Sequence, residues 1–138
     1  MSPVSLLLNV LWILCGGIWM AAAWLIAAVI MAITIIGLPW AKAALTIAVY
    51  TFLPFGSTVI DKPPGAFGGL FALIGNVVWF VLAGWWLALG HLIAAVILAV
   101  TIIGLPFAWA HLKLAGISLW PLGREIVPSD EAQRLPSR

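Results

Sequence analysis

Two long stretches without a charged side chain dominate this sequence. No Asp, Glu, Lys or Arg occurs in residues 1–41, and none occurs in residues 63–112. Uncharged apolar runs longer than about 18 residues are typical of segments inserted in a membrane. Across the chain 65% of the residues are hydrophobic and 7% are charged, whereas soluble domains carry about 25% charged residues. The sequence therefore predicts an integral membrane protein and excludes a water-soluble globule.

The charge balance and the cysteine content exclude several classes of function. Six Lys and Arg residues against four Asp and Glu give a net charge of +2, which is too little for a nucleic-acid-binding surface. A single cysteine, Cys15, excludes an intrachain disulfide and a metal site built from several cysteines. We expect no cofactor, no metal and no nucleic-acid partner. The first apolar segment has no basic residues before it, so we expect it to be retained rather than cleaved as a signal peptide.

The chain is an internal duplication. The string Thr34–Pro39 (Thr-Ile-Ile-Gly-Leu-Pro) recurs as Thr101–Pro106, an offset of 67 residues. In that register residues 7–60 align with residues 74–127 without a gap, and 25 of the 54 aligned positions are identical. The identities include residues that apolar composition alone does not explain: Asn9 and Asn76, Trp12 and Trp79, Gly17 and Gly84, Trp19 and Trp86, and Pro54 and Pro121.

Each repeat predicts a long helix, a break and a shorter second helix. The long stretch Leu6–Ile36 would reach roughly 46 Å as a straight helix, more than the about 30 Å of hydrocarbon in a bilayer, so we expect it to tilt, project or bend. Gly16-Gly17 and the aligned Ala83-Gly84 are the expected bending points. Four residues are candidates for the helix break, because proline fits the first turn of a helix and glycine permits a tight turn: Gly37, Pro39, Gly104 and Pro106.

The predicted fold is an all-α membrane protein with two parallel repeats and four helices. We divide it into a first membrane repeat (1–60), a Pro/Gly linker (61–67), a second membrane repeat (68–127) and a polar tail (128–138). The linker and the tail carry most of the charged residues, and the positive-inside bias places both in the cytoplasm. Each repeat then returns to the side where it starts, which makes the repeats parallel. The sequence leaves open whether the second helices, about 15 residues long, cross the bilayer or are re-entrant.

Several strings of the second repeat resemble a known bacterial family. They are Asn76-x-x-Trp79, Gly84-Trp85-Trp86, Ile102–Phe107, Leu112–Ala115 and Ser118–Arg124. In this order they are similar to the YccF family of small inner-membrane proteins, which is built on the inner membrane component domain. The resemblance covers residues 7–127 and implies a bacterial inner-membrane location and a duplicated domain. It implies no activity and transfers no functional residue.

Every ionisable side chain inside the apolar segments is basic or neutral, while all four acids lie in the linker or near the tail. Lys42, His111 and Lys113 are therefore candidates for binding an anion or a lipid phosphate within the membrane. Both lysines alternatively snorkel to the headgroups. His91 and His111 are candidates for a pH sensor, or are packing histidines held by hydrogen bonds.

Four further polar side chains occupy equivalent positions in the two repeats. Asn9 and Asn76 lie near the start of each long helix, where such amides hold helices together in lipid, or line a pore mouth. Thr34 and Thr101 precede the break, where a hydroxyl bonds a carbonyl one turn back and eases a bend. We expect these four to act as polar helix contacts.

Two function classes remain open, and an enzyme is not expected because no nucleophile–base pair occurs. The leading hypothesis is a small homo-oligomeric channel or transporter with a preference for anions. It rests on the repeat, the broken helices and the basic membrane residues. The alternative is a non-conducting scaffold or lipid-binding partner protein whose ligand is an anionic lipid. Both place the chain in the bacterial inner membrane as a multi-pass protein with both termini in the cytoplasm.

Overall fold

Helices account for most of the chain in a computed structural model that describes residues 1–62 and 68–135. The elements in chain order are α1 (Pro3–Trp12), η1 (Ile13–Gly17), α2 (Ile18–Ile33), α3 (Leu38–Phe52), β1 (Ser57–Asp61), α4 (Gly68–Trp79), η2 (Phe80–Gly84), α5 (Trp85–Val100), α6 (Leu105–Leu119), β2 (Arg124–Pro128) and α7 (Ser129–Ala132). The segments η1 and η2 are π-helical. The order helix, bend, helix, turn, helix and strand occurs twice, once in each half.

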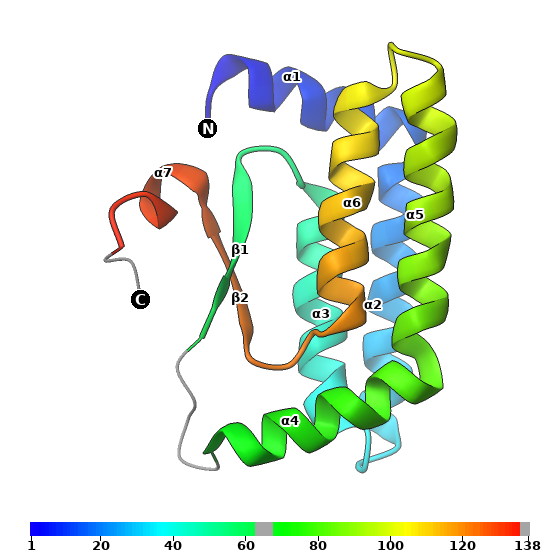
Figure 1. The fold of residues 1–138 in the computed structure, drawn as a ribbon, viewed down its shortest axis with the longest axis vertical. Helices are drawn as coiled ribbons and strands as arrows, with labels where there is room; N and C mark the ends of the chain where they lie inside the picture. Colours follow the sequence, from blue (N-terminus) through cyan, green and yellow to red (C-terminus); the bar gives the residue numbers. More distant parts are fainter. Residues whose placement is uncertain (63–67, 136–138) are drawn as a thin grey trace.

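The long apolar helix of each half bends where the sequence predicts it. Gly16 in η1 has φ of +129°, a conformation that glycine adopts readily and other residues rarely adopt. π-Helical segments of this kind are a common cause of sharp kinks. As a result α1 and α4 lie across opposite ends of the bundle that α2, α3, α5 and α6 form (Figure 1). Each long apolar segment is therefore two shorter arms rather than one straight rod.

Within each half the second helix packs back against the long arm. The tightest associations in the molecule join α2 to α3 and α5 to α6. Small side chains such as Ala28 on α2 and Ala44 and Ala48 on α3 are buried in the first hairpin. Small residues let helix backbones approach closely, which is the usual source of helix association in lipid.

The turn between these helices explains the Gly-Leu-Pro break. Pro39 lies in the first turn of α3, where the N–H that proline lacks would have no helical partner. A Cβ on Gly37 would lie 2.6 Å from the carbonyl oxygen of Met31, so the turn requires glycine. Thr34 Oγ1 donates to that carbonyl at 2.7 Å and accepts from the Gly37 N–H at 3.1 Å. The second half repeats this turn with Leu98, Thr101, Gly104 and Pro106.

A two-stranded antiparallel ribbon, absent from the all-helical prediction, joins the two halves. Strand β1 pairs with β2 in a register that places Val59 opposite Ile126. These two residues are 67 positions apart, so equivalent residues of the two repeats meet at the centre of the ribbon. A local two-fold axis therefore passes between Val59 and Ile126 and relates the halves.

This axis makes equivalent elements run in opposite directions. In Figure 1, α2 and α5 run in opposite directions along the bundle, as do α3 and α6. This finding does not contradict the parallel repeats that the charge pattern predicts. Charge placement indicates on which side of the membrane a repeat starts and ends. It carries no information on the direction in which a helix runs within the molecule.

The elements form three layers. Helices α2 and α5 lie on one side, α3 and α6 lie in the middle, and the ribbon with α7 lies on the opposite side (Figure 1). The core between the halves is aromatic, with Trp24 and Trp79 at a ring separation of 6.4 Å and Trp12 packed against Phe55 and Phe107. These contacts and the ribbon hold the two halves together.

The predicted boundaries fall inside secondary structure at two places. Strand β1 extends across the predicted boundary between the first repeat and the linker at 60/61. Within the predicted tail, Pro128 completes β2 and the short helix α7 follows it. Residues 63–67 of the predicted linker and residues 136–138 of the tail lie outside the described residues.

Candidate anion-binding site

Asn9 and Trp12 fix the chain segment that follows α3. Asn9 Nδ2 donates to the carbonyl of Phe55 at 2.9 Å, and Asn9 Oδ1 accepts from the N–H of Phe55 at 2.9 Å. Trp12 Nε1 donates to the carbonyl of Thr51 at 2.7 Å. The second half repeats these bonds between Asn76 and Leu122 and between Trp79 and Ser118. Both asparagines thus connect a helix to the segment that leads into a strand, and they position β1 and β2.

Lys113 crosses from the second half to this fixed segment of the first half. Its Nζ donates to the carbonyl of Pro54 at 2.6 Å and to the carbonyl of Ser57 at 3.4 Å. The ammonium also lies 5.6 Å from the centroid of the Tyr50 ring and 5.8 Å from that of Phe55, within the range of cation–π attraction. Carbonyls and rings position the charge without neutralising it.

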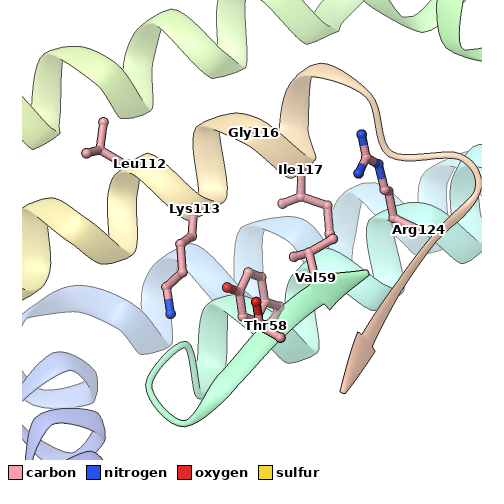
Figure 2. A pocket seen from close by; sticks show the side chains of 8 residues that line it. Thr58, Val59, Leu112, Lys113, Gly116, Ile117 and Arg124 are labelled. Atoms are coloured by element: carbon pink, nitrogen blue, oxygen red, sulfur yellow. The ribbon is translucent and has the colours of Figure 1, made fainter. Parts of the chain in front are cut away.

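The ammonium faces a cavity of about 280 Å³ between α6 and the ribbon. Figure 2 shows the Lys113 side chain extending from α6 toward β1, with Arg124 at the start of β2. The lining residues are Tyr50, Thr58, Val59, Leu112, Lys113, Gly116, Ile117 and Arg124. The cavity therefore combines two cationic side chains with an apolar wall.

The charge of Lys113 makes this cavity a candidate binding site. The ion pair found among the described residues joins Arg124 to Asp61 at 2.6 Å, so Lys113 has no carboxylate partner there. An uncompensated cation beside a cavity suits an anion. The Tyr50 hydroxyl also has no hydrogen-bond partner among the described residues, but its oxygen is fully buried and lies behind the cavity wall.

The chemistry of these donors favours a phosphate-like group. Lysine and arginine make short, charge-assisted hydrogen bonds to phosphate oxygens, and arginine can do so through two parallel bonds. The apolar wall of Leu112, Ile117 and Val59 would tolerate an attached hydrocarbon group. The lining holds no carboxylate, although Asp61 competes for Arg124 from the exposed side of the ribbon.

The equivalent position in the other half does not carry this site. In the repeat register Lys113 corresponds to Thr46, Arg124 to Ser57, and Tyr50 to Ile117. Thr46 Oγ1 donates to the carbonyl of Lys42 within its own helix at 3.0 Å. Glu125 corresponds to Thr58 and adds a negative charge there. The two halves have the same order of helices and strands. The cationic lining residues, however, occur at the cavity on one side of the two-fold axis, and their equivalents on the other side are uncharged.

The structure separates the three cationic candidates that the sequence groups together. Lys113 lines the cavity, whereas Lys42 is exposed on α3 and does not line it. His111 packs in the core, where its Nδ1 lies 3.0 Å from the Nδ1 of His91 and its ring lies 5.1 Å from that of Trp12. Both histidines are buried. A hydrogen bond joins them when one Nδ1 carries a proton and donates while the other accepts. No local pattern in the sequence marks Tyr50 as a site residue. The signal for Arg124 is its place directly after the Leu-Trp-Pro-Leu-Gly string.

Comparison with known proteins identifies the duplicated unit. The model of the YccF family, described as an inner membrane component domain, matches twice, at residues 7–57 and 74–124. The inner membrane protein YccF of Escherichia coli (strain K12) is 31% identical over 132 residues, covering 91% of this chain and 89% of that protein. The inner membrane protein YccF of Shigella flexneri matches to the same extent. No solved structure matches the chain.

Proposed function

The chain belongs to the YccF family of inner-membrane proteins, and we propose that it binds an anionic phospholipid through the cavity between α6 and the ribbon. The lipid phosphate would accept a hydrogen bond from Lys113, and Arg124 would attract the same anion from the other end of the cavity (Figure 2). The acyl chains would lie along the apolar surface of α6. The proposed role is recognition of a membrane component, and it requires no bond to form or break.

The observation that carries this proposal is the environment of Lys113. Its ammonium is held by carbonyls of Pro54 and Ser57 rather than by an acid. A charge that is partly withdrawn from water is costly unless it meets an opposite charge or strong acceptors. Two carbonyls supply part of that stabilisation. An anionic oxygen in the adjoining cavity would supply the remainder.

Lipid retention tests the proposal directly. The full chain and its Lys113→Gln variant would be purified from bacterial membranes, and bound phospholipids would be counted by native mass spectrometry. We expect the unmodified chain to retain phosphatidylglycerol and Lys113→Gln to retain at least about tenfold less, since a charge-assisted hydrogen bond contributes roughly 1.5–3 kcal/mol. Lys42→Gln is the matched control, because it removes an exposed lysine from the equivalent second helix; it should retain the lipid.

Further variants separate loss of binding from loss of folding. Lys113→Arg keeps the positive charge and should restore most of the retention. Inorganic phosphate added in excess should displace the lipid if the headgroup phosphate is what the site recognises. Equal lipid retention by the unmodified chain and Lys113→Gln would contradict the proposal. So would copurification of zwitterionic and anionic lipid in the proportions of the membrane.

Conduction of an anion by a homo-oligomer is a second candidate function, and the duplicated unit together with the lysines of the second helices supports it. Internal structural repeats are common in secondary transporters. Uptake of labelled chloride into liposomes that contain the protein would test conduction, and cross-linking in the same liposomes would report the subunit number. Uptake above that of empty liposomes, lost in Lys113→Gln, would favour conduction. Uptake equal to that of empty liposomes across pH and voltage would contradict it.

A further inference from the structure

The straight helical segments of the described chain are short for the bilayer. The longest, α2 and α5, have 16 residues each, and at 1.5 Å per residue they reach about 24 Å. The arms that precede them, α1 and α4, have 10 and 12 residues. The hydrocarbon core is about 30 Å thick and needs about 20 helical residues to cross. The bends at η1 and η2 therefore turn two helices that could cross by length into arms that individually fall short.

Charge is graded across the three layers of the molecule. The layer formed by α2 and α5 carries no Asp, Glu, Lys or Arg, and neither do α1 and α4. The middle layer carries one lysine on each helix, Lys42 on α3 and Lys113 on α6. The remaining charged residues of the described chain lie on the opposite side, in the ribbon and in the segments next to it: Asp61, Lys62, Arg124, Glu125, Asp130, Glu131 and Arg134. Polarity thus increases from the α2/α5 layer to the ribbon, across the helix axes.

The ribbon argues against helix axes that stand along the membrane normal. It runs alongside the bundle, parallel to the helices, between α1 at one end and α4 at the other (Figure 1). In an upright bundle it would lie within the hydrocarbon with the Asp61–Arg124 ion pair and the unpaired backbone groups of its outer edges. Open sheet edges and irregular backbone do not occur in contact with lipid chains, because nothing there satisfies their hydrogen bonds.

The tips of the helical hairpins lead to the same conclusion. In the turn after α2, Ile35 and Ile36 have exposed fractions of 74% and 84%. In the turn after α5, Ile102 and Ile103 have exposed fractions of 74% and 88%. These turns lie at opposite ends of the bundle (Figure 1). In an upright bundle they would face the two aqueous sides. Four exposed isoleucines without a neighbouring charge suit hydrocarbon instead.

We infer that the chain inserts into the bilayer from one face, with the axes of α2, α3, α5 and α6 parallel to the membrane plane. The α2/α5 layer lies deepest, both hairpin tips lie in hydrocarbon, and the ribbon lies at the headgroups. Helices α1 and α4 descend from the surface to the deep layer, and the bends at η1 and η2 turn the chain into the plane. Both halves then enter and leave on the same side, and the second helices are re-entrant. This inference does not depend on the proposed lipid ligand.

Depth measurements by electron paramagnetic resonance test the orientation. Nitroxide labels would be placed on the full chain in liposomes of phosphatidylethanolamine and phosphatidylglycerol, with Cys15 replaced by alanine. The positions Trp19, Ile26 and Ile33 lie on one exposed face of α2, with exposed fractions of 78%, 61% and 74%. Trp19 and Ile33 are about 21 Å apart along the helix axis. Accessibility to oxygen and to a water-soluble nickel complex gives the depth of each label.

An in-plane helix predicts label depths that vary by less than half of that 21 Å span, because all three labels lie at one level. The equivalent series on α5, at Trp86, Ile93 and Val100, provides the matched control, and we expect it to lie at the same depth. Depths that change by more than half of the span, in opposite directions on α2 and α5, would overturn the inference.

A second readout does not require a depth scale. Single cysteines at Ile36 and Ile103 should resist a membrane-impermeant maleimide from both sides of oriented vesicles, whereas cysteines at Glu125 and Gln133 should react from the same side. Reaction of the two tips from opposite sides would show an upright, crossing bundle. The exposed positions chosen make loss of folding a small risk, and circular dichroism of each labelled variant confirms the fold.

Discussion

Lys113 and Lys42 show why residue type alone does not define a site. Both are lysines on second helices in apolar surroundings, yet one contacts two carbonyls beside a cavity and the other is exposed. The difference comes from Pro54 and Ser57, which lie 59 and 56 residues away in sequence. Asn9, which the sequence predicts as a polar helix contact, fixes that segment by hydrogen bonds to the backbone of Phe55. The sequence predicts the kind of contact that such a residue makes, but it does not identify the distant residue that is contacted.

Asp61 provides a residue-scale test of the electrostatics of the cavity. Its carboxylate pairs with Arg124 at 2.6 Å, and 83% of its side chain is exposed. An exposed pair contributes little to stability, typically less than about 1 kcal/mol. We therefore expect Asp61→Asn to leave the melting temperature in detergent almost unchanged. Retention of phosphatidylglycerol should rise, because Arg124 loses a competing anion. Native mass spectrometry measures the retention, and a fall in retention would contradict this account of the cavity.

At the scale of secondary structure, the repeated turn is the element that the sequence predicts best. Its residues contact one another within six positions, and the types present, Thr, Gly and Pro, each have a local physical reason. The sequence does not reveal that Ile35 and Ile102 have φ of +63° and +62°, which is unfavourable for a β-branched side chain. The ribbon was not predicted either. Its strands are five residues long and are separated by α4, η2, α5 and α6, so their pairing depends on the whole fold.

The turn predicts a clear contrast between two glycine substitutions. Gly37→Ala would place a Cβ 2.6 Å from the Met31 carbonyl oxygen, and relief of such a clash typically costs about 1–3 kcal/mol of stability. Gly90→Ala adds a Cβ in α5 that meets nothing within 4 Å, so it should be neutral or stabilising by up to about 1 kcal/mol. Thermal unfolding in detergent, followed by circular dichroism, compares the two. Equal melting temperatures would show that the turn tolerates the extra carbon.

At the scale of the whole molecule, the duplication produces a symmetric frame with an asymmetric site. Repeat, helix content and bends follow from the sequence because periodicity and composition determine them. The opposite direction of the halves does not, because the ribbon that sets it pairs Val59 with its own equivalent, Ile126. The same axis places Thr46, Ser57 and Glu125 where the first cavity has Lys113, Arg124 and Thr58. One side of the molecule therefore carries the proposed binding site.

The symmetry predicts that a second site can be built. Thr46→Lys, Ser57→Arg and Glu125→Thr together would transfer the cationic cavity residues to the equivalent position. A lysine at position 46 would then face the carbonyl of Pro121, the counterpart of Pro54. Native mass spectrometry should find about one additional anionic lipid per chain, because each site has its own charge-assisted bonds. A folded triple variant with unchanged lipid stoichiometry would contradict the assignment of lipid binding to these cavity residues.

The central claim is that Lys113 holds a lipid phosphate, and a distance measurement tests it most directly. Solid-state NMR of the chain with ¹⁵N-labelled lysine, in phosphatidylglycerol bilayers, reports dipolar coupling between ammonium nitrogen and lipid ³¹P. We expect a component of strong coupling that disappears in Lys113→Gln and persists in Lys42→Gln, because a direct hydrogen bond places the phosphate next to the ammonium. Coupling that is absent, or that is unchanged in Lys113→Gln, would contradict the claim.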